Sequence, residues 1–151
     1  MKQKKEFLRQ RFIDFQMKIA ELSIELRKQK DASLARENKL YLDLIELMDA
    51  FEGLEETIRA KEEGMDETAR MMARSIRAVH RKLSRIIEAN HISRIVFPDN
   101  KARMHTCKIV DTQEAADMEN ETILTVVKNG YIHDELGLVL RKAEVITVLN
   151  G

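Results

Sequence analysis

The stretch TVVKNGYIHDELGLVLRKAEVITVL, residues 125–149, decides the fold because its rhythm differs from everything before it. It is rich in β-branched residues, alternates apolar with polar positions and contains two glycines, Gly130 and Gly137. Such alternation is typical of short strands joined by turns. The first ninety residues are instead charged, helical in period and almost free of turn residues. The pattern predicts an α+β fold, with long helices followed by a small all-β head domain.

Composition narrows the class of protein. Charged residues make up 34% of the chain, but 26 Lys and Arg balance 26 Asp and Glu. A net charge of zero argues against a generic binder of nucleic acid. The single cysteine, Cys107, allows no intramolecular disulfide, and no apolar run is long enough for a signal peptide or a membrane span. We therefore expect a cytoplasmic protein without a nucleic-acid or membrane partner.

Apolar residues in the first sixty positions step alternately by three and four, which is the spacing of a coiled-coil seam. They form two runs, one residue out of phase with each other: Leu8, Phe12, Phe15, Ile19, Leu22 and Leu26, then Leu40, Leu44, Leu47, Phe51, Leu54 and Ile58. The pattern predicts one helix from about residue 3 to residue 60, on the order of 85 Å long. Such a helix needs a partner along its length, and we expect that partner to be a second copy of the chain.

A second helix is expected after a break at residues 61–66. Gly64 is suited to end the first helix, and Asp66 to cap the next one. The second seam comprises Met65, Ala69, Met72, Ile76, Val79, Leu83 and Ile86, and Asn90 is expected to end the helix in a left-handed conformation. Residues 40–92 then form a helical hairpin, and two hairpins make a dimeric four-helix bundle. Residues 1–39 are left as a coiled-coil stalk.

The remaining chain is expected to hold a linker and the β head. Residues 93–104 read as an extended linker through Pro98, and residues 105–151 as the head. Its strands are expected at 105–112, 122–133 and 137–149, with a turn signal at Asn129 and Gly130.

Three segments together resemble the GrpE family, the nucleotide exchange factors of DnaK-type chaperones. Residues 41–58, YLDLIELMDAFEGLEETI, are similar to the family's paired leucines followed by Leu-x-Asp-x-x-Glu spacing, and residues 76–95 to its second bundle helix. Residues 123–148 are most specific, since the family has Gly-Tyr, a short turn, and Leu-Arg-Pro-Ala before alternating valines. The matching residues are Gly130, Tyr131, Leu140, Arg141, Ala143, Val145 and Val148. Lys142 replaces the proline, and NKARMHTC at 100–107 replaces the family's Phe-Asp-Pro signature.

The resemblance implies a homodimeric co-chaperone of protein folding and the stress response, not an enzyme, with no cofactor or metal. One β head would bind the nucleotide-binding domain of a DnaK-type chaperone, open it and promote ADP release, without binding the nucleotide itself. Arg141, Leu140 and Lys142 are the implied chaperone contacts, while Gly130, Tyr131 and Ala143 shape the head. The implied dimer and bundle core comprises Leu8, Phe12, Phe15, Ile19, Leu22, Leu26, Leu44, Leu47, Phe51, Leu54, Ile58, Met72, Ile76, Val79, Leu83 and Ile86.

Two other interpretations remain open from the sequence. The chain is alternatively a coiled-coil scaffold or adaptor whose β head binds an unrelated protein. A nucleic-acid-binding role rests only on an arginine stripe along the second helix, at Arg70, Arg74, Arg77, Arg81 and Arg85. We favour a solvated flank instead, in which these arginines pair with Glu52, Glu55, Glu56 or Glu62. The four histidines fall on different elements, and no residue pattern typical of catalysis is present.

Overall fold

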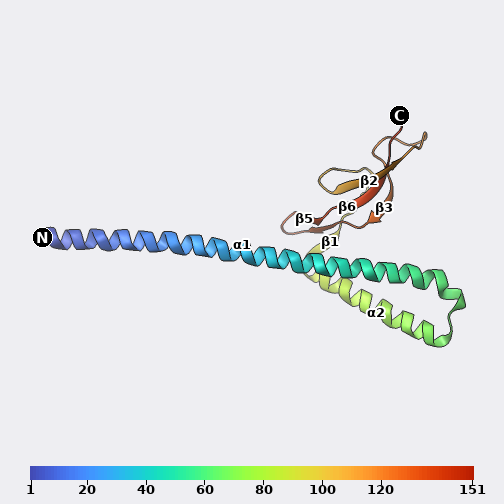
Figure 1. Cartoon of the computed structure of the whole chain (residues 1–151), viewed down its shortest axis with the longest axis horizontal. Helices are drawn as coiled ribbons and strands as arrows, with labels where there is room; N and C mark the ends of the chain where they lie inside the picture. Colours follow the sequence, from blue (N-terminus) through green and yellow to red (C-terminus); the bar gives the residue numbers. More distant parts are fainter. The chain divides into compact units, whose positions relative to one another are not determined.

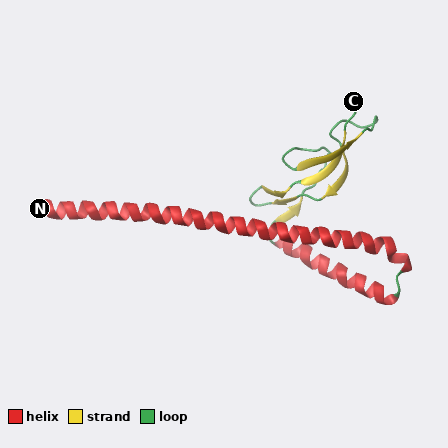
Figure 2. Ribbon diagram, in the orientation of Figure 1, coloured by secondary structure: helices red, strands yellow, loops and turns green.

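The computed structural model describes residues 1–151 and has an α+β fold, as predicted (Figure 1). Helix α1 spans Lys2–Lys61 and helix α2 spans Glu67–Ala89. Six short strands follow, coloured yellow in Figure 2. Their bounds are β1 Ile92–Arg94, β2 Cys107–Gln113, β3 Ile123–Lys128, β4 Tyr131–His133, β5 Leu138–Arg141 and β6 Ala143–Val148. The chain divides into two units, residues 1–39 and residues 40–151.

The first unit is the N-terminal part of α1, and its apolar side chains are uncovered. The seam residues of this part are 54–67% exposed: Leu8, Phe12, Phe15, Ile19, Leu22 and Leu26. A single helix offers no second surface to cover them. Residues 1–39 of one chain therefore lack the apolar burial from which most helix stability in water comes.

In the second unit, α2 follows the C-terminal part of α1 after a short turn. The one-turn 3₁₀ helix Glu62–Gly64 separates them, and the Asp66 side chain accepts a hydrogen bond of 2.8 Å from the Ala69 amide. The predicted cap at Asp66 is confirmed. At the other end of α2, Asn90 was predicted to be left-handed, and this prediction is wrong. Its φ is −96° and its side-chain amide donates to the Ile86 carbonyl, while His91 takes the positive φ of 59°.

The core of this unit joins both helices to the strands. Its buried residues are Tyr41, Ile45, Met48, Leu83, Ile87, Ile92 and Tyr131, and Leu44, Phe51 and Leu140 pack against it from partly buried positions. The predicted seam is only partly buried within one chain. Tyr41, Ile45 and Met48, which lie beside it, are buried, and so are the seam residues Ile58 and Leu83. Other seam residues, such as Leu47, Leu54 and Met72, stay exposed.

Strands β1–β6, residues 92–148, form two three-stranded sheets that we call the β head. One sheet has the order β1-β4-β5 and is antiparallel. The other has the order β2-β6-β3, with β2 parallel and β3 antiparallel to β6. A second small core lies here, built on Cys107, Ala143 and Val145. Cys107 is thus a buried residue, as predicted.

The strand assignment differs from the prediction in three places. Residues 92–94, which span the end of the expected hairpin and the start of the expected linker, form β1 and pair with β4. Asn129 and Gly130 do not close a hairpin, because β3 and β4 belong to different sheets. Residues 138–148 are not one strand, because the chain leaves the first sheet after Arg141 and joins the second at Ala143. The tight turn with a left-handed glycine is at Gly137, between β4 and β5, where φ is 59°.

Candidate functional site

The chain passes between the two sheets three times, and two of these passages lie against each other. One is at Gly130, between β3 and β4, and the other is at Lys142, between β5 and β6. A Cβ added at Gly130 would lie 2.5 Å from the Ala143 nitrogen and 3.0 Å from the Arg141 carbonyl oxygen. The Gly130 carbonyl also accepts a hydrogen bond of 2.9 Å from the Ile95 amide. Glycine is therefore required at this position by close approach of backbone to backbone.

Arg141, at the end of β5, is bound by α1. Its two terminal nitrogens donate to both carboxylate oxygens of Asp49, at 2.6 and 2.7 Å. Its Nε and Nη2 also donate to the Asn129 carbonyl, at 3.1 and 2.7 Å. The side chain is only 17% exposed, and the guanidinium lies 5.5 Å from the centre of the Tyr131 ring. This fork-to-fork pair is the strong form of an ionic hydrogen bond.

Glu52, one turn after Asp49 on α1, makes further contacts with the β head. It accepts a hydrogen bond of 2.9 Å from the Asn129 side-chain amide and pairs with Arg94 on β1. Lys128 lies 3.5 Å from Asp49. The prediction that Glu52 is among the partners of the α2 arginines is therefore wrong. The Leu-x-Asp-x-x-Glu spacing noted at residues 47–52 was the available signal, but nothing local in it indicates a partner in the β head.

Leu140 and Tyr131 face the helices from the same sheet. Leu140 is partly buried against the core shared with α1 and α2, and Tyr131 is 3% exposed within it. Burial raises the pKa of the Tyr131 hydroxyl. Of the residues implied as chaperone contacts, Leu140 and Arg141 therefore lie on the side of the head that meets the helices.

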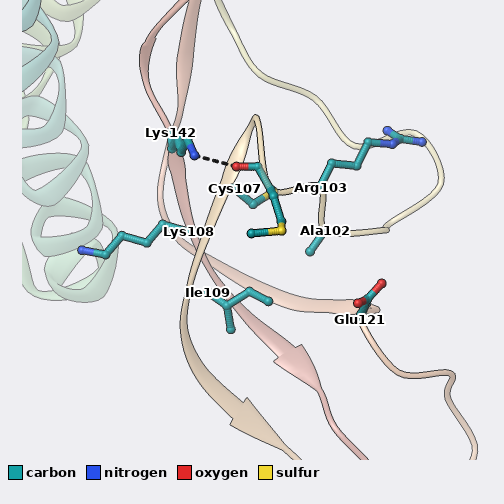
Figure 3. Close-up of a pocket in the computed structure, with 8 residues that line it drawn as sticks. Ala102, Arg103, Cys107, Lys108, Ile109, Glu121 and Lys142 are labelled. Carbon is teal, nitrogen blue, oxygen red and sulfur yellow. Dashed lines mark hydrogen bonds between the residues drawn. The ribbon is translucent and has the colours of Figure 1, made fainter.

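Lys142 lies elsewhere, at the edge of an apolar pocket. Its Nζ donates a hydrogen bond of 2.6 Å to the Met104 carbonyl, drawn as a dashed line in Figure 3. The pocket has a volume of about 440 Å³. It is lined by Ala102, Arg103, Met104, Cys107, Lys108, Ile109, Glu121 and Lys142. Met104 is 90% exposed and Ile109 is 49% exposed, so apolar surface is available at this end of β2. The arrangement suits contact with an apolar side chain and offers no catalytic group set.

The arginine stripe on α2 is partly neutralised by acids. Arg77 binds Glu55 at 2.9 Å and Glu62 at 3.2 Å, and Arg74 lies 2.9 Å from Glu67. The hydrogen bond from Arg77 holds the pKa of the Glu55 carboxyl below its usual value of 4.5. These pairs agree with a solvated flank of the hairpin. No group of three or more His, Cys, Asp or Glu side chains is arranged to hold a metal ion.

Comparison with known protein families shows to which family the chain belongs. A model of the GrpE family matches residues 1–148, which include both helices and all six strands. The chain belongs to the GrpE family. Membership of the GrpE family agrees with the resemblance in residues 41–58 and 123–148 and extends it through the N-terminal part of α1. The family consists of co-chaperones that act as nucleotide exchange factors for DnaK. A search of curated proteins found no match to the chain. Neither helix has a stretch apolar and long enough to cross a membrane.

Proposed function

We propose that this chain is a homodimeric nucleotide exchange factor that promotes ADP release from a DnaK-type chaperone in the cytoplasm. The observation that carries the proposal is the match to the GrpE family over residues 1–148, helices and β head together. The chain itself supplies no residue arrangement suited to covalent chemistry. Its action on the chaperone is therefore one of binding, in which the chain prefers the open form of the nucleotide-binding domain and shifts the population toward it.

The exposed seam supports the homodimer. Six large apolar side chains on residues 1–39 are more than half exposed and lie on one stripe at coiled-coil spacing. In the hairpin, Leu47, Leu54, Met72, Val79 and Ile86 are also uncovered. A second copy would bury both sets at once, as a paired helix along residues 1–39 and as a four-helix bundle at the hairpins. Burial of this stripe would also provide the stability that the long helix lacks alone.

The β head supplies the proposed contact with the chaperone. Lys142 is exposed beside the apolar pocket, so it is available to a carboxylate on a partner, and the pocket to an apolar side chain. Leu140 and Arg141, which precede Lys142 in the chain, lie on the side of the head that meets the helices, where they hold the end of β5. We assign direct contact to Lys142 and the pocket, and support of that contact to Leu140 and Arg141.

Thermodynamic linkage gives the experiment for this proposal. If the chain promotes ADP release by preferring the open chaperone, then ADP and the chain must weaken each other's binding by the same factor. Calorimetric titration of the chain into a DnaK-type nucleotide-binding domain should therefore give a weaker affinity with ADP present than without it. Equal affinities would contradict an exchange factor. Such equality would instead favour an adaptor that uses the β head only to hold its partner.

A further inference from the structure

A set of polar contacts joins one turn of α1 to the β head. Asp49 and Glu52 supply the carboxylates, and Arg141, Asn129 and Arg94 supply the donors. The donors come from β1, from β5 and from the passage between β3 and β4, so the contacts reach two strands of the first sheet and the segment that leads into it. Asp49 and Arg141 are 92 positions apart in the sequence. We call this set the Asp49–Arg141 clamp.

Most hydrogen-bond donors of the Arg141 guanidinium are already used within the chain, so few are available to a partner protein. A guanidinium has five N–H donors. Four hydrogen bonds run from Arg141 to Asp49 and to the Asn129 carbonyl. The group is also largely covered, at 17% exposure, and Asp49 is 25% exposed. A partner carboxylate would have to displace Asp49 to bind Arg141 with the same two-pronged geometry.

The partly buried setting makes each half of the pair depend on the other. Removing one member of such a pair leaves the other as an uncompensated charge, which costs more than the pair itself contributes. The clamp is therefore better suited to fixing one orientation of the β head on the helices than to adding much net stability. The Asp49 carboxylate also lies 3.5 Å from the Lys128 ammonium at the end of β3, so it holds the start of the passage from β3 to β4 as well.

We infer that Asp49 and Arg141 are positioning residues, which fix the β head on α1 so that the surface around Lys142 is presented to the chaperone in one orientation. The inference rests on the proposed exchange function and deepens it. It transfers Arg141 from direct contact to support, and it adds Asp49, a helix residue. A head free to move would bind with an added entropic cost, because its orientation would have to be fixed on binding.

A double-mutant cycle tests the inference in the full-length chain. The variants are Asp49→Ala, Arg141→Ala and the two together, with release of a fluorescent ADP analogue from a DnaK-type chaperone as the readout. Positioning predicts that each single variant loses about fivefold to tenfold in exchange rate at subsaturating concentration, and that the double variant loses no more than either. Asp43→Ala, an exposed aspartate on the same helix, is the matched control and should behave as wild type.

Two results would overturn the inference. If Arg141→Ala loses activity and Asp49→Ala does not, Arg141 contacts the chaperone directly. If the losses multiply in the double variant, the two residues act independently. Asp49→Asn, which keeps the shape and removes the charge, replaces Asp49→Ala if circular dichroism shows that the alanine variant is unfolded.

Hydrogen exchange supplies a readout that does not need the chaperone. In Asp49→Ala, the backbone amides of residues 129–141 should exchange faster, while those of β6 keep wild-type rates. Unchanged exchange at residues 129–141 would overturn the clamp. If the wild-type chain fails to accelerate ADP release, the proposed function fails, and the exchange rates of these amides alone decide whether Asp49 positions the head.

Discussion

The backbone of Gly130 lies so close to Ala143 that a Cβ on the glycine would stand 2.5 Å from the Ala143 nitrogen. Gly130 belongs to the passage from β3 to β4, and Ala143 begins β6. The Ala143 nitrogen donates a hydrogen bond of 2.9 Å to the Thr106 carbonyl, so it has no freedom to retreat without loss of that bond. The passage from β3 to β4 can therefore approach the start of β6 this closely only because Gly130 has no Cβ.

Gly130→Ala should therefore destabilise the β head. We expect a loss of about 1–3 kcal/mol in the free energy of unfolding, because the added methyl must displace backbone rather than a flexible side chain. Denaturant unfolding followed by circular dichroism measures the change. Gly53→Ala is the control, since a Cβ there meets nothing within 4 Å and alanine favours a helix interior. A Gly130→Ala variant as stable as wild type would contradict the close approach.

Ile45 anchors the core between the two helices and the head. It is fully buried, with Tyr41, Met48, Leu83 and Ile87 in the same core. Ile45→Ala should cost about 2–5 kcal/mol through lost burial and the cavity left behind. Leu42→Ala, at a position 37% exposed on the same helix, should cost much less. Thermal unfolding of both variants checks the ranking. Equal losses of stability would contradict the burial of the α1 face that carries Ile45.

The apolar stripe on residues 1–39 gives a prediction about self-association. Leu22→Glu places a carboxylate in the seam and should weaken the dimer at least tenfold, or about 1.4 kcal/mol. Ser23→Glu, also exposed but off the seam, should leave the dimer unchanged. Sedimentation equilibrium measures both. A Leu22→Glu variant that associates as tightly as wild type would show that this stripe does not form the interface.

The pair of Arg77 and Glu55 makes the stability of the hairpin depend on pH. Because the folded pKa of Glu55 is lowered, the ion pair contributes stability that is complete above pH 4.5 and is lost as the pH falls through the lowered pKa. Glu55→Gln should therefore be less stable than wild type at pH 7, and the difference should vanish in acid. Unfolding midpoints measured from pH 7 to pH 3 test the sign.

Glu56→Gln, at the exposed neighbouring position, is the control for this series. Its unfolding midpoints should follow the wild-type curve at every pH. A Glu55→Gln variant whose deficit stayed constant into acid would show that the carboxylate charge is not what Arg77 stabilises.

Periodicity in the sequence predicted the helices well. The steps of three and four residues predicted a helix over about 3–60, and α1 spans Lys2–Lys61. Asp66 was predicted as a cap because its signal is local, three residues from the amide that it binds. The alternation in residues 122–149 also showed that strands were present. These features depend on neighbours in the sequence, which is the information that periodicity carries.

Pairing between distant residues could not be predicted in the same way. Alternation does not say which strand is a partner, so the break at Lys142 and the division into two sheets were missed. Asp49 lies in the Leu-x-Asp-x-x-Glu spacing at residues 47–52, but that spacing does not indicate which residue Asp49 binds. Its contact with Arg141 depends on how the β head folds against α1. The family resemblance implied a role for Arg141, but its bidentate contact with Asp49 arises only in the folded chain.

The central claim is that this chain speeds ADP release from a DnaK-type chaperone through its β head. Stopped-flow release of a fluorescent ADP analogue, with and without the chain, tests it most directly. Lys142→Glu, at the exposed edge of the pocket, is measured beside wild type, with Glu56→Gln on α1 as the control. We predict acceleration by wild type and by the control, and loss of it in Lys142→Glu. Release that is no faster with the dimeric wild-type chain than without it would contradict the claim.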